Sequence, residues 1–305
     1  MNVVRVSPKG AGRVASGHPW IFSSDIADRD GAQPGQAVKV ADPRGRPLGT
    51  AHYSSSSQIS LRMLSRQVEE IGRDFFLRRL RAAEAHRRTV VRHTDAYRVV
   101  HGEADLLPAL VVDRYGDYLV VQTLDQGMDA AKSAIASSLD EIFHPKGIVA
   151  RNDVAVREKE ELPLETTVLS GEVPESVTVQ MNGLTLRADL LRGQKTGIFL
   201  DQRDNYRAAA RYARGGNALD CFTSTGGFAL HVAGKCESVE AADSSAPALV
   251  TARANAAANG IANIDFKEAD IFQLLSNYAS ARRHFSRSEE RRVGKECRSR
   301  WSPYH

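Results

Sequence analysis

The sequence is poor in cysteine and has no long apolar run. Its three cysteines, Cys221, Cys236 and Cys297, are too few for a disulfide framework and lack the Cys-x-x-Cys spacing of a metal site, so we expect no metal. No stretch approaches the roughly 18–20 apolar residues of a membrane span. The first residues lack the apolar segment and cleavage site of a signal peptide. We therefore expect a cytoplasmic protein that does not enter a membrane.

Charge is unevenly distributed, although the 305 residues carry a net formal charge of only +4. Residues 1–100 hold 17 Lys and Arg against 9 Asp and Glu, whereas residues 101–286 hold 18 against 25. A basic N-terminal third indicates either a module that binds a polyanion or a solvated surface without a partner. Charge alone does not decide between the two.

The last 19 residues, 287–305, break the pattern of the chain before them. They show no apolar periodicity, and no linker precedes them. The segment resembles the translation of a sequencing-library adapter, and such foreign segments are left out of fold reasoning. We expect the natural sequence to break near Ser286 and the segment 287–305 to be a non-native tail.

Hydrophobic periodicity divides residues 1–286 into three parts. Residues 1–70 alternate polar and apolar side chains over 36–40 and 59–64, with turn clusters between, which predicts a β-rich domain. Residues 71–186 predict a central α+β domain. Its helix covers 69–92 with Glu69 and Glu70 at the start, a second helical stretch covers 126–142, and two hairpins turn at 116–117 and 182–183.

Residues 187–286 alternate strands and helices. Strands are expected at 217–220, 238–243 and 264–266, with helices over 205–212, 227–233 and 246–259 and a last helix from 271. This alternation predicts the start of a doubly wound parallel sheet. The fold class is therefore α/β, with a β-rich N-terminal domain, an α+β connector and a Rossmann-like domain that is cut short.

The most informative block is 218–228, where an apolar strand ends in Asp220 and a turn then opens a helix. Gly226 and Gly227 let the backbone approach a ligand closely, because neither has a Cβ atom. Asp243 ends the second strand, 23 residues after Asp220, at a spacing that suits hydrogen bonds to both ribose hydroxyls. Asp270, at the end of the third strand, is placed to meet the adenine amino group.

Two cofactors are compatible with this architecture. A dinucleotide requires G-x-G-x-x-G at the first turn, but the turn here reads Thr225-Gly226-Gly227-Phe228. The preceding carboxylate would repel pyrophosphate, whereas it suits the cationic methionine part of S-adenosylmethionine. An NAD-linked oxidoreductase is therefore the weaker alternative, and an ordinary strand–helix turn without a ligand is the other.

Two further segments identify a family. The first segment is the motif Gly193-Gln194-Lys195-Thr196-Gly197-Ile198-Phe199-Leu200-Asp201-Gln202-Arg203, followed by 219–228. It resembles the class I methyltransferases that modify cytosine C5 in large-subunit ribosomal RNA. The segment Gly17-His18-Pro19-Trp20-Ile21-Phe22 resembles the same family, where it lies in a PUA RNA-binding domain. The resemblance runs from about residue 5 to 286.

The resemblance implies S-adenosylmethionine as cofactor and ribosomal RNA as partner, and it is compatible with a homodimer. The cofactor-binding residues that it implies, together with those read from the turn, are Lys195, Asp201, Gln202, Asp220, Phe222, Thr225, Gly226, Gly227, Phe228, Asp243 and Asp270. Lys195 and Asp201 are alternatively a surface ion pair.

The sequence departs from the family at its end. Members continue with a strand ending in Asp-Pro-Pro-x-Phe and a later cysteine, but here only 283–286 stand where that strand begins. Cytosine C5 is not nucleophilic until a thiolate adds to C6. Cys221 lies inside the first cofactor motif, Cys236 at a loop or strand start, and Cys297 in the foreign tail. We therefore expect no catalytic residue in this chain and no methyl transfer by it.

Basic and aromatic residues of the N-terminal third are candidates for RNA contact. The exposed helix arginines Arg73, Arg78, Arg81 and Arg88 are candidates for phosphate contacts. His18 and Trp20 either stack on RNA or form part of the core of a small β domain. Two functions follow: an RNA methyltransferase, or a fragment that binds RNA and cofactor without catalysis.

Overall fold

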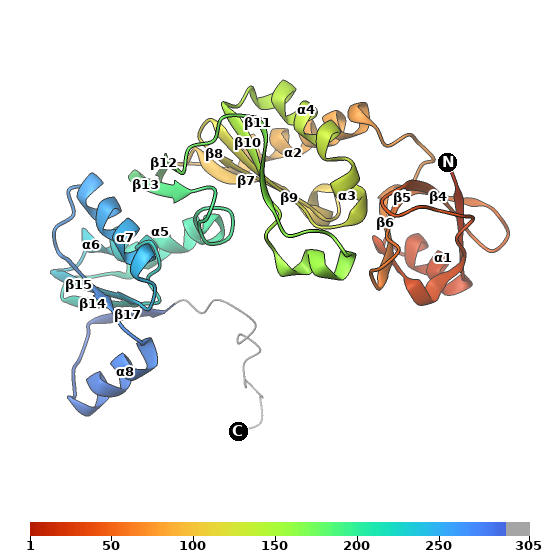
Figure 1. Ribbon diagram of the computed structural model, residues 1–305. Helices are drawn as coiled ribbons and strands as arrows, with labels where there is room; N and C mark the ends of the chain where they lie inside the picture. Colours follow the sequence, from red (N-terminus) through yellow and green to blue (C-terminus); the bar gives the residue numbers. More distant parts are fainter. Residues whose placement is uncertain (291–305) are drawn as a thin grey trace. The chain divides into compact units, whose positions relative to one another are not determined.

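The computed structural model describes residues 1–290, with side chains placed through Ser286; the rest of the expected tail, including Cys297, lies outside the described residues. Its contacts divide the chain into two compact units. Unit 1 comprises 1–177 and 189–197, and unit 2 begins with 178–188 and continues from 198. Figure 1 shows the elements of both.

The N-terminal domain of unit 1 is a six-stranded sheet with the order β2-β6-β5-β4-β1-β3. Its core contains Val4, Val38, Ile21 and Leu61. The elements are β1 (Val3–Val6), α1 (Pro8–Ala15), β2 (Trp20–Phe22), η1 (Ser23–Asp25), β3 (Ile26–Asp28), β4 (Ala37–Ala41), β5 (Pro47–Tyr53) and β6 (Ile59–Ser65). The strands agree with the predicted β-rich domain.

Helix α1 corrects the expectation of strands and turns alone over this region. Pro8 stands at the first helical position, and the Ser7 side chain accepts a hydrogen bond from the Gly10 amide. Both features stabilise a helix start, because proline has no amide hydrogen to satisfy and serine satisfies one that is exposed.

The central domain of unit 1 is a five-stranded sheet with the order β11-β10-β9-β8-β7. Helix α2 packs against α4 and β7, and Phe76, Leu80 and Leu139 are fully buried. The elements are α2 (Arg73–Val90), β7 (Ala96–His101), η2 (Gly102–Asp105), β8 (Leu110–Tyr115), β9 (Tyr118–Thr123), α3 (Gln126–Ala130), α4 (Lys132–Phe143), β10 (Gly147–Arg151), η3 (Ala155–Glu160) and β11 (Thr166–Gly171). The hairpin predicted at 116–117 is confirmed by the antiparallel pairing of β8 with β9.

Two predicted helix boundaries were wrong. Helix α2 begins at Arg73 with Gly72 as its N-cap, so Glu69 and Glu70 precede the helix and Asp74 is the acid of its first turn. The stretch expected as one helix is divided into α3 and α4 at Ala131. Helix ends depend on capping and on tertiary contacts that periodicity does not record.

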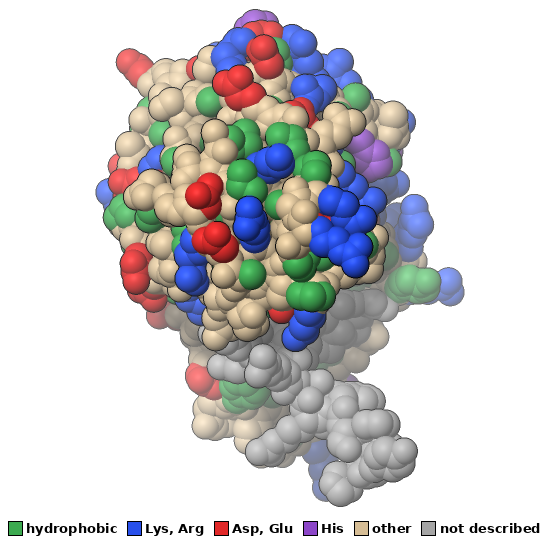
Figure 2. Space-filling model, turned by 90° about the vertical axis from the view of Figure 1, so that its right-hand side faces the viewer, with side chains coloured by type: hydrophobic (Ala, Val, Ile, Leu, Met, Phe, Trp, Pro, Cys, Tyr) green, Lys and Arg blue, Asp and Glu red, His purple; other side chains and the backbone are tan. Residues whose placement is uncertain are grey.

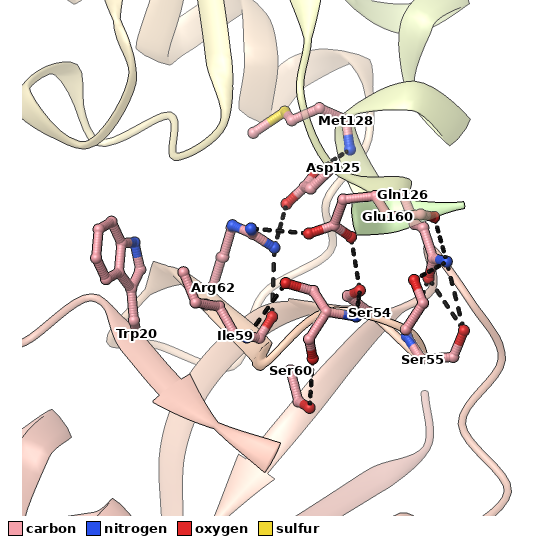
Figure 3. A network of polar contacts seen from close by, with 12 residues as sticks. Trp20, Ser54, Ser55, Ile59, Ser60, Arg62, Asp125, Gln126, Met128 and Glu160 are labelled. Carbon is pink, nitrogen blue, oxygen red and sulfur yellow. Dashed lines mark hydrogen bonds and ion pairs between the residues drawn. The ribbon is translucent and has the colours of Figure 1, made fainter. Parts of the chain in front are cut away.

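A buried polar network joins the two domains of unit 1 (Figure 3). Arg62 of β6 lies 2.9 Å from the Glu160 carboxylate and 3.5 Å from that of Asp125. Glu160 also accepts a hydrogen bond from Ser54, and Gln126 donates to the Glu160 carbonyl. Because Arg62 and Ser54 belong to the N-terminal domain and their carboxylate partners to the central domain, the network fixes the N-terminal sheet against α3 and η3.

Unit 2 contains a parallel sheet with the order β16-β15-β14-β17. Its elements are β12 (Ser176–Met181), β13 (Leu184–Asp189), η4 (Leu200–Gln202), α5 (Arg203–Tyr212), β14 (Asn217–Cys221), α6 (Gly227–Ala233), β15 (Ser238–Asp243), α7 (Ala246–Ala258), β16 (Ile264–Glu268), α8 (Ile271–Ser280) and β17 (Arg287–Glu290). The predicted alternation of strands and helices is confirmed, as is the hairpin at 182–183. This is the strand order of a doubly wound sheet around its first strand.

Two details of unit 2 differ from expectation. The start of the expected non-native tail forms β17, which pairs in parallel with β14, and this strand begins at Arg287 rather than at Arg283. Such pairing uses backbone groups on an open strand edge and needs no apolar periodicity. Asp270 does not end the third strand, because β16 stops at Glu268 and Asp270 caps α8 instead.

Within residues 1–290, no helix combines the length and the apolar composition needed to cross a membrane.

Candidate cofactor site

The turn after β14 holds Asp220 in a fixed position. This side chain is 2% exposed, and its Oδ2 accepts hydrogen bonds from the Thr223 hydroxyl at 2.5 Å and from the Ala229 amide at 3.0 Å. The backbone between strand and helix is left-handed at Phe222, Ser224 and Gly226, with φ of 59°, 51° and 88°. Left-handed backbone in non-glycine residues is costly and gathers at ligand-binding turns.

Asp243 ends β15 and faces the same turn. Its Oδ2 accepts a hydrogen bond from the Ser224 amide at 2.8 Å, and its Oδ1 accepts one from the Ser245 amide at 2.9 Å. A carboxylate has about four lone-pair sites. Two sites on Asp243 therefore stay available for a ligand, and the side chain is only half-buried.

Gly227 is the first residue of α6, and the packing of Tyr206 of α5 against it leaves no room for a side chain. A Cβ atom at this position would lie 2.4 Å from the phenol of Tyr206. Tyr206 in turn contacts the Phe228 ring edge-on, with centroids 4.8 Å apart, and stacks on His231. The close approach of α5 to the turn thus depends on a glycine whose backbone dihedrals are ordinary.

His231 links α6 to the β12–β13 hairpin. Burial lowers the pKa of His231, so the ring is neutral. Its Nδ1 lies 2.7 Å from the Gly227 carbonyl, which can only accept, and its Nε2 lies 3.1 Å from the amide nitrogen of Asn182. These partners place the proton on Nδ1.

Two asparagines, Asn255 of α7 and Asn259 at its C-cap, were not predicted as site residues. Asn255 is 1% exposed; its side chain accepts from the Arg187 amide and donates to the Thr225 carbonyl of the turn. Asn259 exchanges two hydrogen bonds with the backbone of Thr185. Asparagine is unfavourable in helix interiors, so Asn255 within α7 was the available signal.

The structure brings together part of the expected cofactor set. Asp220, Thr225, Gly226, Gly227 and Asp243 lie around one turn at the carboxyl edge of the parallel sheet, where ligands of such sheets bind. Carboxylates at this edge suit a cationic amino acid part and a ribose, so these residues fit S-adenosylmethionine. Phe222 contacts Phe272 edge-on, with ring centroids 5.9 Å apart.

The other expected residues are placed as follows. Asp270 is exposed and accepts a hydrogen bond from the Gln273 amide. Asp201 and Gln202 lie in η4, and the Gln202 side chain accepts from Asn205. Contact of these residues with the cofactor stays a prediction.

Lys195 belongs to a segment that packs with unit 1. The neighbouring Thr196 is 2% exposed, and its hydroxyl donates to Asp113 at 2.7 Å and lies 2.9 Å from the Tyr115 hydroxyl. Gly197 has φ of 152°, and a Cβ there would lie 3.2 Å from the Tyr115 ring. The motif is thus anchored on β8, and the role of Lys195 beside the cofactor stays a prediction.

The four predicted phosphate-binding arginines all have carboxylate partners. Arg73 and Arg81 both pair with Glu141, Arg78 with Glu69 at 2.6 Å, and Arg88 with Glu84 at 3.0 Å. Their side chains are nevertheless 45% to 73% exposed. Figure 2 shows Lys and Arg side chains gathered in clusters on the face viewed, with acidic side chains among them.

His18 and Trp20 lie at a domain boundary within unit 1. The Trp20 indole nitrogen donates to Glu103 of η2 at 2.7 Å, and the His18 ring lies edge-on to Trp20. Both side chains are half-buried. These contacts favour a packing role for Trp20, while RNA contact by either residue stays a prediction.

Comparison with known proteins agrees with this geometry. A family model of a PUA-like domain matches residues 4–66, and one of S-adenosylmethionine-dependent methyltransferases matches 134–280. A Streptococcus mutans structure described as a SAM-dependent methyltransferase superposes with a TM-score of 0.80 at 20% identity, covering 94% of this chain and 76% of that one. This likeness supports the fold.

The sequence relatives are closer. Ribosomal RNA large subunit methyltransferase I of Photobacterium profundum is 42% identical over 270 residues, which cover 86% of this chain and 68% of the relative. The protein of the same name from Erwinia tasmaniensis is 40% identical over 269 residues, with the same coverage. The chain therefore belongs to the ribosomal RNA large subunit methyltransferase I family of S-adenosylmethionine-dependent methyltransferases.

Proposed function

We propose that the family to which this chain belongs transfers a methyl group from S-adenosylmethionine to C5 of a cytosine in large-subunit ribosomal RNA. The observation that carries the cofactor part is the pair of carboxylates, Asp220 and Asp243, held by backbone amides on one turn. The RNA part is supported by the names of relatives that are 40% and 42% identical. The cofactor supplies an electrophilic methyl group.

The residues of the turn divide the binding task. Asp220, held by Thr223 and Ala229, would receive the cationic ammonium group, and Asp243 would use its remaining acceptor sites for the ribose hydroxyls. Glycine at 227 allows Tyr206 to close the turn from the α5 side. These positions are set before a ligand arrives, which lowers the entropy cost of binding.

Methyl transfer to C5 requires a nucleophile that attacks C6, and neither cysteine of the described residues is positioned for this role. Cys221 is fully buried in β14, and Cys236 lies in the loop between α6 and β15. A thiol that is fully buried in a strand cannot reach C6 of a substrate base. We therefore propose that the 305-residue chain binds cofactor and RNA without transferring the methyl group.

A transfer assay tests this proposal. The chain is incubated with radiolabelled S-adenosylmethionine and unmodified large-subunit ribosomal RNA, and the RNA is digested to nucleosides. We expect binding of the RNA and no label above background. Label in 5-methylcytidine contradicts the proposed inactivity, and label in any other nucleoside contradicts the cytosine C5 assignment as well.

A further inference from the structure

A groove lies within unit 1 between the N-terminal sheet and α2. Its volume is about 660 Å³, within the range of about 300–1,000 Å³ typical of ligand pockets. It is lined by the end of α1, the loop before β2, the end of β6 and the first turns of α2. None of the expected cofactor residues lies in it.

The groove combines an apolar wall with a basic rim. The apolar side chains are Val14, Pro19, Met63, Leu64 and Leu106, and the charged ones are Arg66, Arg78, Arg79 and Glu69. A hydrogen bond from Ser65 and the ion pair with Arg78 hold the pKa of Glu69 below its usual range, so it is ionised and occupies Arg78. The Arg79 side chain donates to the Leu64 carbonyl.

Arg66 is the cation that this rim leaves available. It is exposed, and no hydrogen bond or ion pair of its side chain occurs within the described part of the chain. Gly17 has φ of 88°, and a Cβ atom there would lie 3.0 Å from Nη2 of Arg66. The guanidinium group therefore rests over a glycine at the edge of the groove, where a phosphate can reach it.

Leu106 is the second unusual feature. It is 57% exposed although it is a large apolar residue, and its φ is 58°. A left-handed backbone is unfavourable for leucine, and asparagine adopts it more readily. More than half of its surface is exposed, so this apolar surface is available to a ligand that enters the groove.

We propose that this groove binds one unpaired nucleotide of the RNA substrate, with the base against Leu106 and the apolar wall and its phosphate on Arg66. This inference rests on the proposed function, because that function supplies RNA as the partner. An apolar wall can pack against the face of a base only when the base is unstacked, so the site selects single-stranded over paired RNA.

The test uses the full chain and a fluorescently labelled single-stranded RNA of mixed sequence, with binding followed by fluorescence anisotropy. The variants are Leu106→Asn and Arg66→Gln, and the matched control is Arg44→Gln, an exposed arginine of the same domain outside the groove. Asparagine suits the backbone at 106, so thermal melting is expected to show no loss of stability.

We expect Leu106→Asn to weaken single-strand binding about tenfold, because the base loses its contact with an apolar side chain, and to leave binding of a duplex of the same sequence unchanged. Arg66→Gln should weaken it severalfold and make the slope of log affinity against log salt shallower by about 0.7. Arg44→Gln should change the single-strand affinity less than twofold. Cytidine 5′-monophosphate should compete far more weakly than the strand.

Three results overturn the inference. If both groove variants bind the single strand as the unmodified chain does, the groove is not the site, while the proposed function stands. If Leu106→Asn weakens single strand and duplex alike, the groove does not select an unpaired base. If the unmodified chain binds no RNA, the proposed function fails together with the groove.

Discussion

Arg62 offers the sharpest test of how the two domains of unit 1 are held together. Its side chain is 10% exposed, and both of its carboxylate partners are 2% exposed. Replacement by methionine in Arg62→Met keeps the length of the side chain and removes the charge. Two buried carboxylates then lose their cation, which costs about 3–5 kcal/mol.

The cost is bounded by protonation. Burial raises the pKa of Asp125 to about 6, although the neighbouring Arg62 opposes the rise. Without Arg62 the pKa rises further, so Asp125 takes up a proton near neutral pH and one of the two charges disappears. Adding Asp125→Asn and Glu160→Gln removes both charges, and we expect this triple variant to recover at least half of the lost stability.

Urea unfolding followed by tryptophan fluorescence measures the effect. Trp20 reports on the N-terminal domain, and replacing the only other tryptophan, in Trp301→Phe, makes the signal specific. The control is Arg46→Met, because Arg46 is 73% exposed in its ion pair with Asp42 and should contribute less than about 1 kcal/mol. Equal losses for Arg62→Met and Arg46→Met would show that the buried ion pairs of Arg62 do not hold the two domains together.

Three further predictions concern pH and packing. Burial raises the pKa of Asp125 from 3.8 to about 6, so the contribution of this carboxyl to the free energy of unfolding falls as pH rises between these values. Burial lowers the pKa of His52 from 6.5 to about 4, so the contribution of this imidazole rises with pH over that interval. In urea titrations we therefore expect the free energy of unfolding of Asp125→Asn, which keeps His52, to increase by about 3 kcal/mol between pH 4 and 6. That of His52→Gln, which keeps Asp125, should decrease by about 3 kcal/mol. Parallel pH curves for the two variants would contradict this. Gly227→Ala should lower the thermal stability of unit 2 by about 1–3 kcal/mol through the clash with Tyr206, whereas Gly234→Ala, which meets no atom within 4 Å, should not. Thr196→Val should lower the stability of unit 1 by about 1–3 kcal/mol, because Asp113 and Tyr115 lose a buried partner, and an unchanged urea midpoint would argue against that anchor.

The fold was predictable where local chemistry determines it. Asn182-Gly183 specifies a hairpin turn, and the strands and helices from 217 to 258 follow an apolar periodicity that the structure confirms. Helix α1 was missed because two of its eight residues are glycines and only two are buried. The strand β17 was missed because its pairing with β14 depends on backbone groups rather than on a side-chain pattern.

Only those site residues that follow directly from the strand pattern could be predicted from the sequence. Asp220 and Asp243 end strands whose carboxyl ends must meet at one sheet edge, so their proximity to the turn could be derived from sequence. Tyr206 and Asn255 reach the same turn from α5 and α7. An asparagine inside a helix marks Asn255 as unusual, but no local pattern shows which segment either side chain contacts. Trp20 was read as an RNA-contact or core aromatic, but its bond to Glu103 joins residues 83 positions apart.

Calorimetry with S-adenosylhomocysteine tests the cofactor site most directly. We expect the full chain to bind this ligand and not NAD, and Asp243→Asn to weaken the binding about tenfold or more. Asp265→Asn, on β16 with its carboxylate 68% exposed, is the matched control and should bind as the unmodified chain does. Binding of NAD in place of S-adenosylhomocysteine, or equal affinities for the two variants, would contradict a methyltransferase cofactor site built on Asp243.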